Sequence, residues 1–130
     1  MAKLEHRNLN DTPEIKEFEF GRVQIAKHGG VTFGRATLQP GWKWSKSVKP
    51  LAKTASCQAS HLQYQVSGRL HVVMDDGTAA EFVAGDVAQI PPGHDAWVVG
   101  NEPVVIIDVS GMVDYAKPAS PHAGRSQFTD

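Results

Sequence analysis

The 130-residue sequence lacks the features that mark several large classes of protein. It has a single cysteine, Cys57, so no disulfide can form within the chain and nothing points to an oxidising compartment. No run approaches the roughly 20 apolar residues that span a bilayer. Residues 1–18 also lack the apolar stretch of a secretory signal. We therefore expect a soluble, cytoplasmic protein with no membrane partner.

An excess of charge of one sign is also missing. The 13 lysines and arginines nearly balance the 14 acidic residues, whereas nucleic-acid-binding proteins usually gather basic side chains on one face. The mildly basic stretch at residues 43–53 contains four lysines. It is interpreted as a solvated loop or, alternatively, as a rim that attracts an anionic ligand. We expect no nucleic-acid partner.

Short catalytic signatures are equally scarce. The chain has no glycine-rich phosphate loop, no Gly-x-Ser-x-Gly and no Cys-x-x-Cys, which removes the common nucleotide-binding, hydrolase and redox motifs. No segment has the pattern of an amphipathic helix, and residues 41–56 are expected to form a long loop.

The sequence does contain many short segments with the two-residue alternation of β-strands. Residues 61–66 alternate between polar and apolar side chains, and residues 104–109 form a strongly apolar strand that should be buried. Turn signals such as Asp76-Gly77 separate these segments. About eight to ten strands with such spacing predict an all-β barrel or sandwich.

The organisation of the chain is expected to be simple. Its length suits one domain with its own core, which we place at residues 16–111. Residues 1–15 are polar, and residues 112–130 are rich in Pro, Ala, Ser and Gly, so both ends are expected to be arms. The arms and the apolar strand at residues 104–109 are candidates for forming a homodimer.

Glycine and proline residues recur at a defined spacing in the second half of the chain. Gly68 ends one motif, and Gly85, Pro91 and Gly93 follow the pattern Gly, five residues, Pro-x-Gly. This spacing resembles that of the cupins, over about residues 35–110. The resemblance implies a small conserved barrel of the double-stranded β-helix, or jelly-roll, type.

The metal-ligand positions of the cupin pattern are altered here. The family has two histidines and a glutamate in its first motif and another histidine in its second. By this resemblance, Cys57 takes the place of a histidine, His61 that of the glutamate, and Ala96 that of the last histidine. His94 stands two residues before Ala96.

Cys57, His61 and His94 nevertheless carry donors suited to one divalent metal ion, with Zn²⁺ first and Fe, Mn or Ni as alternatives. On a straight strand, Cys57 and His61 would lie about 13 Å apart, so a shared metal requires a bend between them. The same separation disfavours a nucleophilic thiol–imidazole pair. The alternative is that Cys57 is a small buried hydrophobe and that the histidines are hydrogen-bonded core residues.

A ligand pocket is predicted beside these residues. Gln63, Gln65 and Gln89 are expected to line it and Trp44 to lie at its mouth, because buried amides need hydrogen-bond partners and an indole can hold a ligand. The alternative is that the glutamines face solvent and that the tryptophan only packs against the barrel.

Three hypotheses for function follow. The first is a small-molecule-binding barrel with a degenerate or atypical metal site. The second is a metal-dependent enzyme of oxygenase, isomerase or decarboxylase type, acting on a small organic acid through Cys57, His61 and His94. The third is an interaction or regulatory module, since such barrels resemble sensor domains. The fold alone does not choose among them.

Overall fold

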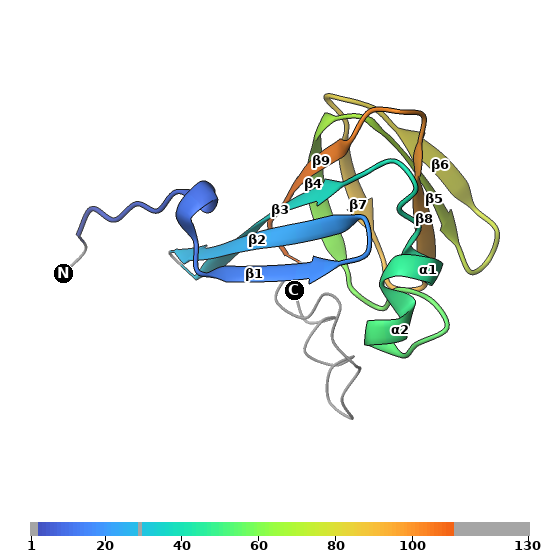
Figure 1. The fold of residues 1–130 in the computed structure, drawn as a ribbon, viewed down its shortest axis with the longest axis horizontal. Helices are drawn as coiled ribbons and strands as arrows, with labels where there is room; N and C mark the ends of the chain where they lie inside the picture. The colour runs from blue at the N-terminus through green and yellow to red at the C-terminus, as the bar shows by residue number, and fades with distance from the viewer. Residues whose placement is uncertain (1–2, 29, 111–130) are drawn as a thin grey trace.

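The structure is a computed structural model that describes residues 3–28 and 30–110. Within these residues the chain forms nine strands, a 3-10 helix and two four-residue helices (Figure 1). The first five strands are β1 (Glu14–Phe18), β2 (Gly21–His28), β3 (Val31–Leu38), β4 (His61–Ser67) and β5 (Arg69–Met74). The others are β6 (Ala79–Phe82), β7 (Val87–Ile90), β8 (His94–Val99) and β9 (Val104–Asp108). The all-β prediction is confirmed.

The strands form two antiparallel sheets that share one core. The larger sheet has the order β1-β2-β3-β9-β4-β7, and the smaller one has the order β6-β5-β8. Buried side chains of both sheets, such as Ile25 and Val72, belong to a single apolar cluster. Figure 1 shows the smaller sheet facing strands β3, β9, β4 and β7, while β1 and β2 extend away from it.

The predicted alternation of β4 is present and decides which side chains can form a site. His61, Gln63 and Gln65 are buried, whereas Leu62, Tyr64 and Val66 are 44%, 47% and 46% exposed. Because successive side chains of a strand point to opposite faces, the polar residues of β4 lie on the inner face. This arrangement reverses the usual distribution, in which the inward residues of a strand are apolar.

The apolar strand at residues 104–109 corresponds to β9, and it is buried as expected. It pairs with β3 on one side and with β4 on the other, so neither edge of β9 is available to another chain. The homodimer therefore stays a prediction that would need other surfaces. Residues 112–130, the predicted C-terminal arm, lie outside the described residues.

Residues 41–56 differ from the predicted loop because they contain α1 (Trp44–Ser47) and α2 (Lys49–Ala52). Proline lies in the first turn of α2, and Lys53 ends it in a left-handed conformation with a φ of 60°. Each helix is only one turn long, so no 3.6-residue period could be seen in the sequence. No helix among the described residues is long and apolar enough to cross a membrane.

Part of the predicted N-terminal arm has regular secondary structure. It contains the 3-10 helix η1 (Leu9–Asp11), and β1 begins at Glu14. The hydroxyl of the buried Thr12 donates a hydrogen bond of 2.5 Å to the Ile25 carbonyl, which ties this segment to β2.

The glycine that ends the first motif has a clear structural reason. Gly68 lies between β4 and β5 with a φ of +78°, and an added Cβ would come within 2.6 Å of the Pro103 carbonyl oxygen and 2.8 Å of Val104 Cα. Gly77, in the β5–β6 hairpin turn, has a φ of +91° but open space around the Cβ position. Both turns need a left-handed residue, while only the first also needs the absence of a side chain.

These two glycines make a matched pair for a stability measurement. We expect Gly77→Ala to lower the free energy of unfolding by about 1 kcal/mol, the cost of a left-handed alanine. Gly68→Ala should lower it by about 3 kcal/mol, because the steric overlap with the backbone before β9 adds to that cost. Urea denaturation followed by circular dichroism measures both values, and equal losses would contradict the close approach at Gly68.

Candidate metal site

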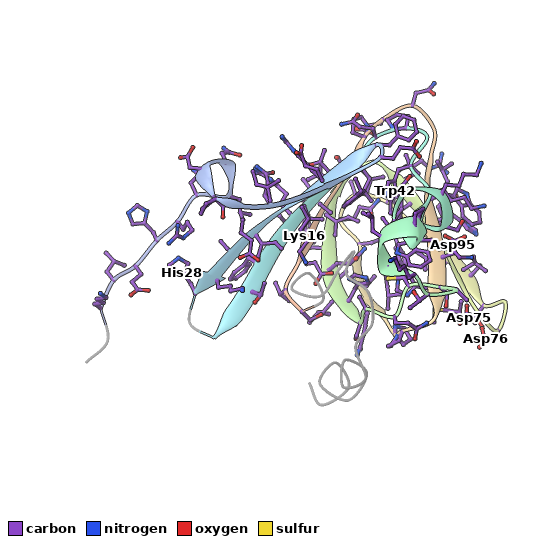
Figure 2. The ribbon with its side chains drawn as sticks, turned by 60° about the horizontal axis from the view of Figure 1, so that its bottom comes forward. Lys16, His28, Trp42, Asp75, Asp76 and Asp95 are labelled. Atoms are coloured by element: carbon purple, nitrogen blue, oxygen red, sulfur yellow. The ribbon has the colours of Figure 1, made fainter. Side chains whose placement is uncertain are left out.

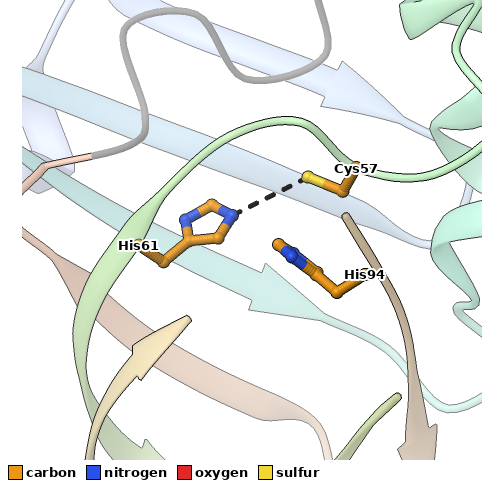
Figure 3. Close-up of side chains that lie close together, drawn as sticks. All are labelled: Cys57, His61 and His94. Atoms are coloured by element: carbon orange, nitrogen blue, oxygen red, sulfur yellow. Dashed lines mark hydrogen bonds between the residues drawn. The ribbon is translucent and has the colours of Figure 1, made fainter. Parts of the chain in front are cut away.

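Three side chains from separate segments meet at the inner face of the barrel (Figure 3). Cys57 precedes β4, while His61 and His94 are the first residues of β4 and β8. One ligand atom from each residue lies within 4.8 Å of the others, and all three residues are buried. The structure thus brings together the three residues whose chemistry suggested a metal site.

The chain between Cys57 and His61 is not a straight strand. Cys57 forms an isolated bridge with His94, in which its N–H donates to the His94 carbonyl oxygen at 2.7 Å. Residues 58–60 belong to no strand, and Figure 3 shows the chain curving between Cys57 and His61. As a result, Cys57 Sγ lies 3.8 Å from His61 Nε2 rather than at the distance that an extended strand would impose. The required bend is present.

His61 is oriented by a buried carboxylate that sequence reasoning missed. Its Nδ1 lies 2.5 Å from Oδ2 of Asp108, the last residue of β9, and Asp108 has no exposed surface. Oδ1 of the same carboxylate accepts a hydrogen bond from the Ser110 N–H at 2.8 Å. One signal was visible in the sequence: the acid falls on the inward alternation of the strand, with Val104 and Ile106.

His94 is oriented in the same way by a backbone group. Its Nδ1 lies 2.9 Å from the Pro91 carbonyl oxygen, which can only accept a hydrogen bond, so Nδ1 carries the hydrogen. In both His61 and His94 an acceptor therefore faces Nδ1, which directs Nε2 toward the cluster. Metal-binding histidines are commonly held by such partners on the opposite ring nitrogen.

The electrostatics of the cluster favour a charged pair. Burial opposes ionisation of Cys57, but hydrogen bonds and positive charge from His61 and His94 outweigh it and lower the pKa of the thiol from 9.0 to about 6. Burial also opposes the charge on His61, but Asp108 and Cys57 outweigh it and raise its pKa from 6.5 to about 10. Both shifts favour a thiolate beside an imidazolium.

A cavity of about 30 Å³ adjoins the cluster and lies between the two sheets. Volume of this size holds about two water molecules. Within the described chain, its titratable lining residues are His61 and His94, and its other polar ones are Gln63, Trp42 and Trp44. Its remaining lining residues are apolar: Ala36, Leu38, Leu70, Val72, Ile90, Ala96 and Ile106.

The two tryptophans reach the cavity through contacts with β8. The Trp42 carbonyl accepts a hydrogen bond of 3.1 Å from Val98 N–H. Asp95 accepts a hydrogen bond of 3.1 Å from the Ser45 N–H, which holds α1 against the barrel. Figure 2 shows Trp42 and Asp95 on the side of the molecule where α1 lies. Trp44 is only 2% exposed, so it forms part of the cavity wall rather than the expected mouth of a pocket.

The three glutamines of the predicted pocket have different positions. Gln63 lines the cavity. Gln65 is 1% exposed, and its Nε2 donates to the carbonyl oxygens of Gly68 at 2.9 Å and Phe82 at 3.1 Å, so it ties strands together. Gln89 is exposed on β7 and lines a separate, open cleft along that strand. Of the three, the structure brings only Gln63 to the cavity.

The geometry also bears on a nucleophilic role for Cys57. Cys57, His61 and Asp108 are arranged as nucleophile, base and orienting acid, so the distance argument against such a pair does not hold. However, Cys57 is 3% exposed and is not among the residues that line the cavity. A molecule in the cavity would contact the histidines before the sulfur, and this favours a metal site.

The paired charges predict an unusual pH dependence of stability in the presence of a chelator. Folded Cys57 loses its proton near pH 6 and unfolded Cys57 near pH 9, so its contribution to stability grows as pH rises through that window. Folded His61 keeps its proton up to about pH 10, whereas unfolded His61 loses it near pH 6.5, so its contribution declines. The two slopes largely cancel between pH 6.5 and 9.

We expect Cys57→Ser to remove this cancellation. As the pH rises from 6.5 to 9, the free energy of unfolding of Cys57→Ser should decrease relative to that of the wild type, by at most about 1.4 kcal/mol per pH unit. The double variant Cys57→Ser/His61→Gln lacks both titrations and serves as the control. Parallel profiles for wild type and Cys57→Ser would show that the charged pair is absent.

Comparison with known proteins supports the fold. No protein-family model matches the chain, and no curated protein matches it. Solved structures do match it, including a Cupin 2 conserved barrel domain protein from Salinispora arenicola at 20% identity and a TM-score of 0.59, covering 83% of this chain and 88% of that one. A Rhizobium leguminosarum protein of unknown function matches at 16% identity and a TM-score of 0.58, covering 83% and 96%.

An enzyme appears among the similar structures as well. Oxalate decarboxylase from Bacillus subtilis matches at 25% identity and a TM-score of 0.52, covering 84% of this chain. This chain spans 28% of the length of that protein, which has Mn(II) centres. These likenesses and the two-sheet architecture agree with the spacing of Gly68, Gly85, Pro91 and Gly93. The chain has a cupin-type β-barrel fold.

Proposed function

We propose that this chain binds one divalent metal ion through Cys57, His61 and His94 and binds a small molecule in the adjoining cavity. The observation that carries the proposal is the matched orientation of the two histidines. Each ring has its Nδ1 against an acceptor, Asp108 for His61 and the Pro91 carbonyl for His94. That leaves the Nε2 atoms and the Cys57 sulfur to act as ligands, and their mutual distances suit one ion.

Zinc fits this donor set best. One sulfur and two imidazole nitrogens are ligands that Zn²⁺ commonly takes in proteins, and three protein ligands leave a position for water or another small molecule. Iron, manganese and nickel are the alternatives, and the Mn(II) of oxalate decarboxylase makes manganese worth including in metal analysis. When bound, such an ion supplies Lewis acidity.

Binding fits the cavity better than catalysis does. Acid–base catalysis needs a positioned group of suitable pKa near the reacting atoms. Among the residues that line the cavity, His61 and His94 are the titratable ones, and the proposal uses both as ligands. Gln63 and the indole groups can hold a molecule but do not exchange protons with it at neutral pH.

A metal-dependent enzyme is the second candidate, and the position left by three protein ligands favours it, since catalytic zinc sites share that arrangement. Loss of a small organic acid from a mixture incubated with metal-loaded protein, followed by proton NMR, would support this candidate. His94→Ala should not cause this loss of the acid.

In either case Cys57 has to remain reduced, which agrees with the proposed cytoplasmic location.

Metal analysis tests the proposal directly. We expect one Zn²⁺ per chain and, with Co²⁺ in its place, the absorption of a thiolate-bound metal. Cys57→Ser should abolish that absorption, and His94→Ala should lower the affinity by more than about 100-fold, since it removes a ligand. Asp108→Asn removes only the partner of a ligand and should lower the affinity about 10- to 100-fold.

His71→Ala is the matched control, because His71 lies in β5 and stacks on Trp97 with ring centroids 4.5 Å apart. It should bind metal as the wild type does. Wild-type protein that takes up no metal, or Cys57→Ser that keeps the thiolate absorption, would refute the site.

A further inference from the structure

We propose that the cavity selects a small carboxylate, held by the side-chain N–H groups of Trp42, Trp44 and Gln63. The inference deepens the proposed function and rests on it, because it concerns the molecule that would lie beside the metal ion. It starts from three buried polar atoms: Trp42 Nε1, Trp44 Nε1 and Gln63 Nε2 have no hydrogen-bond partner within the described part of the chain.

The three residues that carry these atoms line one cavity. Trp42 precedes α1, Trp44 begins it, and Gln63 lies in β4, yet all three line the same cavity. They are 3%, 2% and 5% exposed, so bulk water does not satisfy them. Buried donors without a partner are unfavourable and rare in folded proteins. Three of them around one cavity indicate that its occupant supplies the acceptors.

The chemistry of the donors determines what the occupant offers. An indole N–H donates and never accepts, so two of the three groups require an acceptor whichever way the Gln63 amide is turned. With the Nε2 atoms of His61 and His94 used as metal ligands, the Gln63 amide oxygen is the remaining side-chain acceptor among the lining residues. An occupant with its own N–H or O–H groups would therefore leave some of them unpaired, whereas a carboxylate only accepts.

Metal coordination and size point the same way. An anion can bind the divalent ion directly at the position that three protein ligands leave open, even though the Cys57 thiolate and the Asp108 carboxylate behind His61 balance the charge of the ion. The cavity of about 30 Å³ has room for about two water-sized groups. This volume limits the occupant to the smallest carboxylates, and the apolar side chains Leu38, Leu70 and Ile106 of the wall suit a small apolar substituent.

The indole signals in nitrogen–proton NMR spectra of zinc-loaded protein test the inference, with acetate as the probe. Acetate should shift the indole signals of Trp42 and Trp44 in a saturable way. Trp97 is the internal reference, because it stacks on His71 and does not line the cavity. Acetamide has nearly the same shape, but it is uncharged and carries donors, so it should bind at least about tenfold more weakly.

Two glutamine variants make the test specific. Gln63→Glu replaces the donor with an anion inside the cavity and should weaken acetate binding at least about tenfold. Gln89→Glu makes the same change of charge on the exposed face of β7 and should leave binding unchanged. Zinc content is measured for every sample, so that loss of the metal cannot be mistaken for loss of the carboxylate site.

The outcomes separate the two proposals. Zinc-loaded protein whose Trp42 and Trp44 signals ignore acetate, or respond equally to acetamide, would overturn the carboxylate site and leave the metal site standing. Equal weakening by Gln63→Glu and Gln89→Glu would show that acetate is attracted only by overall charge and would also overturn it. A chain that binds no zinc would instead refute the proposed function.

Discussion

The buried carboxylate of Asp108 is the constraint on which the candidate site depends. A carboxylate without exposed surface is tolerated only when hydrogen bonds and a nearby positive charge compensate for its lost hydration. His61 provides that compensation from the adjacent strand, with Nδ1 at 2.5 Å, and the Ser110 N–H provides a second hydrogen bond. The pairing fixes the ring of His61, turns its Nε2 toward Cys57 and places a polar group where a barrel core is normally apolar.

The rest of the site follows from two backbone features. The bridge between Cys57 and His94 joins the segment before β4 to the start of β8. The Cys57 sulfur and the His94 imidazole therefore lie next to each other. The turn at Pro91 places its carbonyl against His94 Nδ1. One carboxylate and one backbone carbonyl thus orient the two imidazoles, as is common for histidines that bind a metal ion.

The cavity adds a second, independent polar requirement. Its wall is mostly apolar, yet it carries indole and amide donors that have no partner among residues 3–28 and 30–110. Polar groups in a low-dielectric environment bind strongly when they are satisfied and destabilise the fold when they are not. A metal ion and an acceptor-rich ligand would together satisfy both sets of groups, the imidazoles on one side and the N–H donors on the other.

The sequence by itself determined the barrel and the identity of the three clustered residues. Strand alternation and turn residues are local properties, and a left-handed turn such as the one at Gly68 favours glycine even before its tertiary neighbours are known. Cys57, His61 and His94 could be named because they supply soft or imidazole donors at or near the ligand positions of the cupin motifs that the sequence resembles. One-turn helices such as α1 leave no periodic pattern, so the sequence did not predict how this segment places Trp42 and Trp44 against the barrel.

Only the tertiary structure decided which side chains meet. Asp108 is 47 residues from His61 in the chain, and their contact depends on β9 pairing beside β4 in a particular register. Gln63 faces the cavity as expected from the alternation of β4, whereas the register of β7, which places Gln89 opposite the outward Leu62, leaves Gln89 outside. The two-residue pattern of a strand determines which side chains face the core, but it does not identify the distant strand with which it pairs.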